Sequence, residues 1–187
     1  MAANVGIIRV TGANTSSFTV DITGNNTVAN ADDFAYTVAT GSTNPVRIPA
    51  SGTTNYSYWV TTRLIAYTSP AGTINNIRWY TDGANNFSTS AATITAVAQQ
   101  GQTYYQAGGT SGTSGTQLTA AVNTGLYAAP VDPFTYTSTS PLTVTGAVTN
   151  PSSGQFGNYV VYQLVVTYGN VPGVTNQETF TWLYDET

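Results

Sequence analysis

The chain has no cysteine, no histidine and no lysine. Without cysteine it has no disulfide, no thiolate nucleophile and no cysteine-ligated zinc or iron–sulfur site. Without histidine it lacks the commonest general base and the commonest transition-metal ligand, and without lysine it can form neither a Schiff base nor a Walker-type phosphate loop. Catalysis would have to use carboxylates, hydroxyls and tyrosines alone. We therefore predict that the protein is not an enzyme and uses no metal ion or cofactor.

Charge of either sign is scarce as well. Only 6% of the 187 residues are charged, against about 25% in an average protein. Four arginines on a chain of net charge −4 cannot neutralise a run of phosphates, so we predict no nucleic-acid partner. No apolar run approaches the ~20 residues of a membrane span, so we predict no membrane partner either. Threonine is the abundant polar residue, with 35 copies.

The first residues, MAANVG, contain neither a basic region nor an apolar region of a secretory signal. We therefore expect synthesis in the cytoplasm of a host cell without export. A thiol-free surface rich in Thr, Asn and Gly nevertheless suits a protein that persists outside a cell. Together these features favour a component of a virus particle.

Alternation of apolar and polar residues with a period of two dominates the chain and predicts β-strands. One stretch, residues 159–168, is apolar on both faces and is therefore expected to be a central strand covered on each side. Residues 17–22 are expected to form a half-buried strand with Phe18, Val20 and Ile22 on its buried face. The remaining expected strands are residues 6–10, 33–38, 45–48, 56–67, 74–81, 142–145 and 179–184.

The segment 107–116, AGGTSGTSGT, has low complexity and is predicted to be a flexible loop without an apolar anchor. Too few strands follow it to form a core of their own, so residues 1–187 are expected to form one domain. A helical period occurs only near residues 118–126, where at most one short helical turn is expected. The fold prediction is an all-β single domain, a β-sandwich or jelly roll with long Gly/Ser/Thr-rich loops.

Carboxylates offer two candidate sites. Asp32 and Asp33 are adjacent, so on an extended chain they point to opposite sides and cannot converge on one substrate. Loop carbonyls with Asp32 or Asp82 could hold calcium, but no calcium-loop motif is present and a solvated turn is the simpler interpretation. A glycosidase pair is the least favoured interpretation, because no spacing selects two members of the set Asp21, Asp82, Asp132, Glu178, Asp185 and Glu186.

Aromatic residues offer another candidate site, because tyrosine and tryptophan rings can stack on sugars. Tyr104 and Tyr105 lie beside the glycine-rich segment and are the candidates for exposed contact. Trp79 and Trp182 are flanked by alternating residues and are expected in the core or in an interface. Arg63 lies inside a predicted strand, as does Arg78, and each is expected to pair with a carboxylate or with carbonyl oxygens.

Several stretches of the chain resemble small virion structural proteins of tailed bacteriophages. The resemblance rests on residues 49–59, on Thr-Thr-Arg-Leu at 61–64, on INNIRWYTDG at 74–83, on YVVYQLVV at 159–166, on Pro-Gly at 172–173 and on FTWLYDE at 180–186. These are strand and turn patterns without reactive groups, so no functional residue is carried over.

The resemblance implies a protein that decorates or cements a phage head or sits on the tail. Its partners would be the major capsid protein or other virion proteins. Because such proteins often sit at symmetry axes, a homo-oligomer is expected, with a trimer as one option. The alternative function is a glycan-binding β-sandwich module of a phage tail or fibre.

Overall fold

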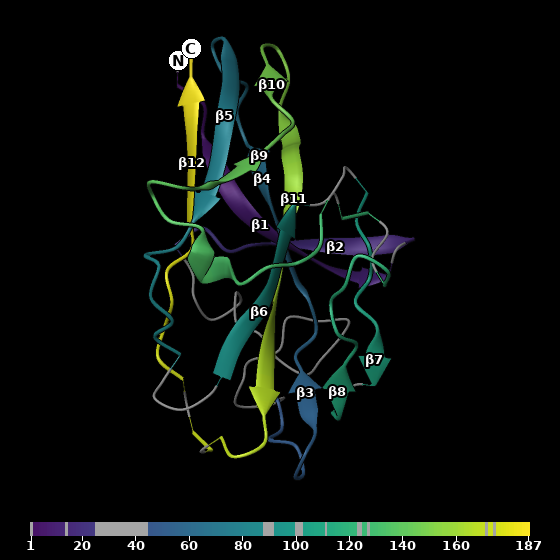
Figure 1. Ribbon diagram of the computed structural model, residues 1–187. Helices are drawn as coiled ribbons and strands as arrows, with labels where there is room; N and C mark the ends of the chain where they lie inside the picture. The colour runs from purple at the N-terminus through teal and green to yellow at the C-terminus, as the bar shows by residue number, and fades with distance from the viewer. Residues whose placement is uncertain are drawn as a thin grey trace.

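The computed structural model describes the backbone of residues 92–99, and both backbone and side chains of residues 2–13, 15–24, 45–87, 103–110, 112–122, 125–126, 128–170, 172–173 and 175–187. Its strands form antiparallel sheets packed together as an all-β sandwich, as the alternation predicts. Figure 1 shows both ends of the chain side by side at one end of the molecule. The described part contains no helix long and apolar enough to cross a membrane.

The larger sheet, sheet A, has six strands, and the long strand β11 (Gly154–Thr167) is the central one. One edge of β11 pairs first with β4 (Val60–Ala66) and then with β3 (Thr54–Tyr56), and its other edge pairs with β6 (Ala92–Gln99). Beyond β4 come β1 (Val5–Ala13) and the edge strand β2 (Ser16–Asp21). Residues 156–166 of β11 are all buried, which confirms the prediction of a central strand covered on both faces.

The smaller sheet, sheet B, is built around β5 (Thr73–Tyr80). β5 pairs with β12 (Thr181–Glu186), with β9 (Leu142–Val144) and with β10 (Val148–Thr149). A short 3₁₀ helix, Pro133–Thr135, begins where the Asp132 side chain accepts a hydrogen bond from the Phe134 N–H at 3.0 Å. A separate two-stranded ribbon joins β7 (Gly109–Thr110) to β8 (Ser114–Gly115).

The first core cluster fills the space between sheets A and B. Trp79 of β5 is fully buried there and contacts the ring of Phe180, with centroids 5.1 Å apart. Phe180 in turn meets Tyr162 of β11, with centroids 4.8 Å apart. Trp182 is half-buried against the same cluster. Both tryptophans therefore belong to the core, as predicted.

The second core cluster lies on the opposite face of sheet A, and loop segments cover it. Tyr159 and Val161 of β11 pack there with side chains from the region 104–126. Two side chains of the region around sheet A form several of the hydrogen bonds across this contact. Gln163, which is fully buried, accepts from the Leu118 N–H at 2.8 Å and donates to Thr116 O at 2.9 Å. Trp59 Nε1 also donates to Thr116 O, at 3.0 Å.

The segment 107–116 is therefore anchored, which corrects the expectation of an unanchored loop. It forms the β7–β8 ribbon, and Gly115 packs against the backbone of Ser57. A Cβ atom built at Gly115 would lie 2.3 Å from Ser57 O, so a side chain there requires the backbone to move. The anchor combines Ala107, which is buried in the second cluster, with close backbone approach and hydrogen bonds. An apolar count along the sequence does not detect the backbone approach or the hydrogen bonds.

Three predicted strands differ from the observed ones. The predicted strand 56–67 is interrupted at residues 57–59, where Gln163 Nε2 donates to Ser57 O at 2.7 Å. As a result Tyr58 packs in the second cluster and Val60 in the first, although an uninterrupted strand 56–67 would place residues 58 and 60 on one face. Residues 45–48 form no strand. The predicted half-buried strand 17–22 is β2, but Phe18 is 64% exposed.

Strand β6, the helical turn and the predicted strand 33–38 remain to be compared with the structure. β6 was not predicted from the sequence, and the only helix-like feature of residues 118–122 is a turn in which the Val122 N–H donates to Thr119 O at 3.2 Å. The predicted strand 33–38 and the Asp32–Asp33 pair lie outside the described residues.

Candidate functional site

The six candidate carboxylates of the glycosidase set each accept a hydrogen bond from within the chain. Asp132 caps the 3₁₀ helix, and Glu186 accepts from the Ala3 N–H at 3.0 Å, which ties the two ends of the chain together. Asp185 pairs with Arg78. In the described part of the chain no three acidic side chains gather as a metal-binding group would.

Two of these carboxylates, Asp82 and Glu178, accept hydrogen bonds from the same residue, Asn86. Asn86 Nδ2 donates to Asp82 Oδ2 at 3.3 Å and to Glu178 Oε2 at 3.5 Å, and the Asn86 N–H donates to Glu178 Oε1. Asp82 is exposed and also accepts from the Ala84 N–H at 2.9 Å. These contacts close the turn after β5 and tie it to the segment that leads to β12.

Another carboxylate of this set, Asp21, lies beside Tyr67 on the surface. The Tyr67 hydroxyl and the Thr23 N–H both donate to Asp21. These hydrogen bonds stabilise the charged carboxylate, so they lower the pKa of Asp21, and the same contact raises the pKa of Tyr67. Both side chains are exposed, which leaves the pair in water and makes it a local surface contact.

Tyr104 and Tyr105, the candidates for exposed contact, are both half-buried against the second core cluster. The Tyr104 hydroxyl donates to Gly12 O at 2.9 Å, and its ring centroid lies 6.4 Å from that of Tyr159. Burial raises the pKa of Tyr104 to about 12. The two rings therefore help to hold the loop region on sheet A and do not form an exposed stacking platform.

Arg63 satisfies backbone carbonyls at a bulge of β11, as predicted. Its Nε donates to Gly157 O at 2.6 Å, and its guanidinium carbon lies 4.8 Å from the ring centroid of Tyr159. Gly157 in this bulge has a φ of +72°, which favours glycine, and the segment that folds back on it also needs glycine, because a Cβ atom at Gly146 would lie 2.9 Å from the Gly157 Cα atom.

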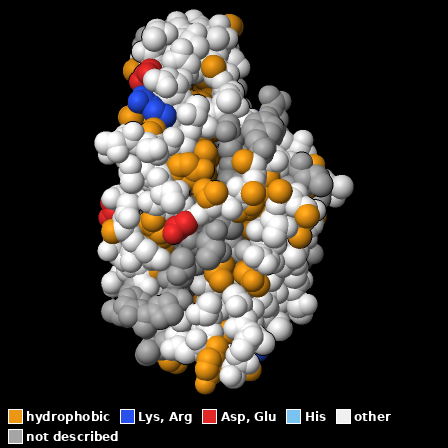
Figure 2. Space-filling model, viewed as in Figure 1, with side chains coloured by type: hydrophobic (Ala, Val, Ile, Leu, Met, Phe, Trp, Pro, Cys, Tyr) orange, Lys and Arg blue, Asp and Glu red, His pale blue; other side chains and the backbone are white. Residues whose placement is uncertain are grey.

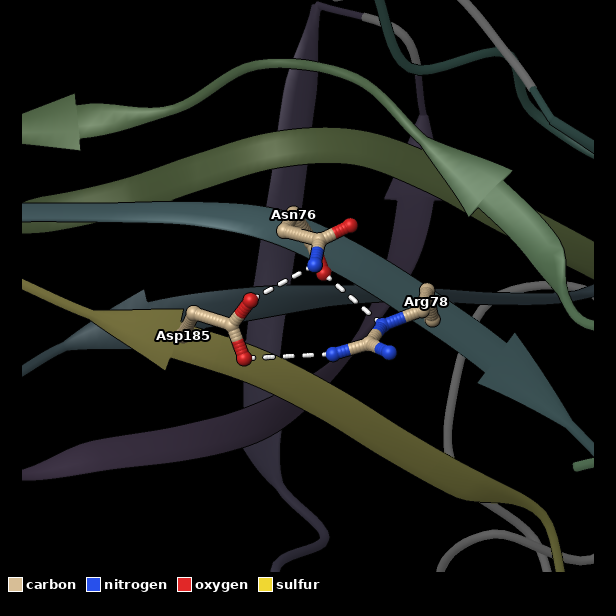
Figure 3. A network of polar contacts seen from close by, with 3 residues as sticks. All are labelled: Asn76, Arg78 and Asp185. Carbon is tan, nitrogen blue, oxygen red and sulfur yellow. Dashed lines mark hydrogen bonds and ion pairs between the residues drawn. The ribbon is translucent and has the colours of Figure 1, made fainter.

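Arg78 forms a small polar network on the outer face of sheet B (Figure 3). Its guanidinium Nη2 contacts Asp185 Oδ1 at 3.2 Å, and its Nε donates to Asn76 O at 3.1 Å. Asn76 Nδ2 completes the ring by donating to Asp185 Oδ2 at 2.6 Å. The predicted pairing of Arg78 is confirmed, and the network neutralises two of the few charges on this face.

The exposed surface is mostly uncharged. Figure 2 shows one face on which white atoms predominate, which belong to the backbone and to side chains that are neither hydrophobic nor charged, with hydrophobic side chains between them and few red or blue atoms. On the outer face of sheet B, Leu183 lies opposite Arg78 in the strand register and is 41% exposed. Large hydrophobic residues that are exposed across the described residues are Phe18, Tyr67, Val122, Val131, Tyr168 and Leu183.

Alternation along β2 did identify Phe18 as apolar and regularly placed, but it assigned the side chain to the core. No sequence signal separates an edge strand from an interior one when both alternate, so the exposure of Phe18 follows only from its place at the end of sheet A.

No family model, no curated protein and no solved structure matches this chain.

Proposed function

We propose that this protein is a non-enzymatic structural component of a virus particle, of the capsid decoration or cement type. It would hold neighbouring subunits through apolar and hydroxyl-rich contacts. The observation that carries the proposal is the use of charge: the six described carboxylates are engaged within the chain, and Arg63 and Arg78 are paired as well. Few ions are left for a partner.

The outer face of sheet B is one surface suited to such contacts. Leu183, Tyr80 and Thr181 lie on it beside the neutralised Arg78–Asp185 pair. A contact of this composition gains free energy from burial of apolar area and from hydrogen bonds, and it pays little desolvation of charge. The setting in a virion is supported by the thiol-free, low-charge composition and by the resemblance to small phage virion proteins.

The proposal is tested first by composition. Virus particles purified from cells that carry this gene should contain the chain in many copies, counted by mass spectrometry against the major capsid protein. Its absence from purified particles would overturn the proposal.

Washing the same particles tests the mechanism. At about 1 M salt the Debye length falls to about 3 Å, which weakens exposed ion pairs and leaves apolar burial largely unchanged. Copies should therefore stay bound in salt and leave in moderate urea, which solvates apolar and peptide groups. Release by salt alone would show that charge dominates the contact.

A further inference from the structure

The edge strand β2 lacks the features that usually protect a sheet edge. It pairs with β1 on one side, and no strand in the described part of the chain pairs with its other side. Natural edges commonly carry lysine, proline, a bulge or an inward charge. The sequence of β2, SSFTVD, has no lysine or proline, its one charged residue is the last, Asp21, and its register with β1 runs without a shift. Such an edge can accept another strand.

The apolar side chains of β2 are also uncovered. Among the large hydrophobic residues that the structure describes, Phe18 is the most exposed, at 64%, and Val20 is half-buried. The two residues are two apart, so both side chains lie on the same face of the strand. β2 runs toward the right in Figure 1, whereas sheet B lies at the upper left. The pair therefore forms a small apolar surface next to the open edge.

The direction of the backbone groups follows from one hydrogen bond. The Ile22 N–H donates to Ile7 O at 2.8 Å, so the backbone of Ile22 faces β1. Because the groups alternate along an antiparallel strand, every second residue back from Ile22 also faces β1. The residues whose N–H and C=O groups face outward are therefore Ser17, Thr19 and Asp21.

We propose that β2 pairs antiparallel with β2 of a second copy of this chain, across a two-fold axis at Thr19. When the pairing is centred on Thr19, the outward-facing N–H and C=O groups of all three residues are paired with those of the second copy. Phe18 of each copy then lies opposite Val20 of the other, and an aromatic side chain opposite a β-branched one is a favourable cross-strand pair. Asp21 lies opposite Ser17, so the two carboxylates are at opposite ends of the contact.

This contact involves a six-residue strand and is smaller than a standard interface, which buries about 800 Å² per partner. The dimer is therefore weak and depends on concentration. A two-fold contact closes as a dimer, which differs from the trimer considered from the resemblance. The inference does not depend on the proposed function, because it concerns the purified chain alone.

The two-fold axis allows a specific test, since Thr19 faces its own copy. Thr19→Lys and Thr19→Glu each place like charges opposite one another, whereas an equimolar mixture places opposite charges together. By sedimentation of the full chain, each variant alone should have a dissociation constant raised about fivefold or more. The mixture should return to the affinity of the unchanged protein or exceed it.

Two further variants complete the test, the first as a control and the second as a direct disruption of the contact. Thr175→Lys adds the same charge at an exposed threonine outside β2, and it should leave self-association unchanged. Phe18→Ser should abolish the dimer while the melting temperature of the dilute protein stays nearly constant, because the ring is exposed in the single chain.

Two results would overturn the inference. One is a protein that stays monomeric up to its solubility limit. The other is a dimer whose affinity is the same in Thr19→Lys, in Thr19→Glu and in their mixture. A failed particle assay under the proposed function would leave this test unaffected.

Discussion

The two faces of sheet A are covered by different kinds of structure. Sheet B covers the first face with strands, and its core contains the fully buried Trp79. Loop segments between residues 104 and 126 cover the second face, and the strands that the structure describes in them are the two short ones of the β7–β8 ribbon. The core between the sheets is the larger, and both cores include alternate residues of the same strand β11.

The difference shows how each covering layer satisfies its backbone. Strands of sheet B pair with one another, so their N–H and C=O groups need nothing from sheet A. The loop layer has few partners within itself and obtains them from side chains around sheet A, above all from Gln163. A strand layer is thus held by apolar packing, whereas the loop layer is held by packing and by a few specific hydrogen bonds. Four substitutions test this contrast.

The largest effect is expected on the strand-covered face. Trp79→Ala leaves a cavity where a fully buried indole packs on Phe180, and it should cost about 3–5 kcal/mol of unfolding free energy, measured by urea titration. Trp79→Phe is the matched control. It should cost much less, because it keeps an aromatic ring and removes an indole N–H that is buried without a hydrogen-bond partner in the described structure. Equal losses for the two variants would contradict the packing argument.

The next effect concerns the hydrogen bonds of the loop-covered face. Gln163→Leu keeps the volume but leaves the Leu118 N–H and Ser57 O without their partner, which should cost about 2–4 kcal/mol. Hydrogen exchange should accelerate at Leu118 before it accelerates in β5. Gln155→Leu, at an exposed position of the same strand, is the control and should change little. Uniform acceleration across both sheets would show that the loop layer is not separately attached.

A smaller effect is expected where the ribbon approaches the sheet. Gly115→Ala places a Cβ atom against Ser57 O, and the required backbone shift should cost about 1–3 kcal/mol by thermal or urea unfolding. Thr113→Ala, at an exposed position in the turn of the same ribbon, should be nearly neutral. If Gly115→Ala is also neutral, the ribbon is not anchored in the way described.

The smallest effect is a loss of stability at alkaline pH, to which one tyrosine on each face of sheet A contributes. Burial raises the pKa of Tyr104 on the loop-covered face and of Tyr162 on the strand-covered face, each from an ordinary value of 10 to about 12. Both phenols therefore stabilise the fold fully below pH 10, and this stability is lost as the pH rises from 10 through 12.

Tyr104→Phe should remove only the part of this alkaline loss of stability that ionisation of Tyr104 causes, and the part from Tyr162 should remain. It should also cost about 1 kcal/mol below pH 10, because the hydrogen bond to Gly12 O is lost. The measurement is the free energy of unfolding across this range, alongside ultraviolet titration of the late-ionising tyrosines. An unchanged alkaline slope in the variant would refute the assignment of Tyr104.

Much of the strand content could be predicted from alternation, because a half-buried strand requires an apolar residue at every second position. This holds for β4, β5, β11 and β12 within a few residues of their observed ends. The prediction failed at residues 57–59, since the interruption depends on Gln163, which is distant in sequence and enters only when β11 lies alongside. Of the candidate site, the pairing of Arg63 and Arg78 could be predicted, because a charge inside a strand needs a partner. Exposed tyrosines could not, because exposure depends on what packs above them.

The sequence by itself determined that this is a β protein with a low-charge surface, because side-chain periodicity and composition are local properties. The tertiary structure alone decided which face of each strand is covered, and by what. It anchored the glycine-rich segment to sheet A through Gly115 and Thr116, and it left Phe18 at an open edge. Both outcomes depend on contacts between residues far apart in the chain. Alternation states that a face is apolar, but the neighbouring element decides whether that face is buried.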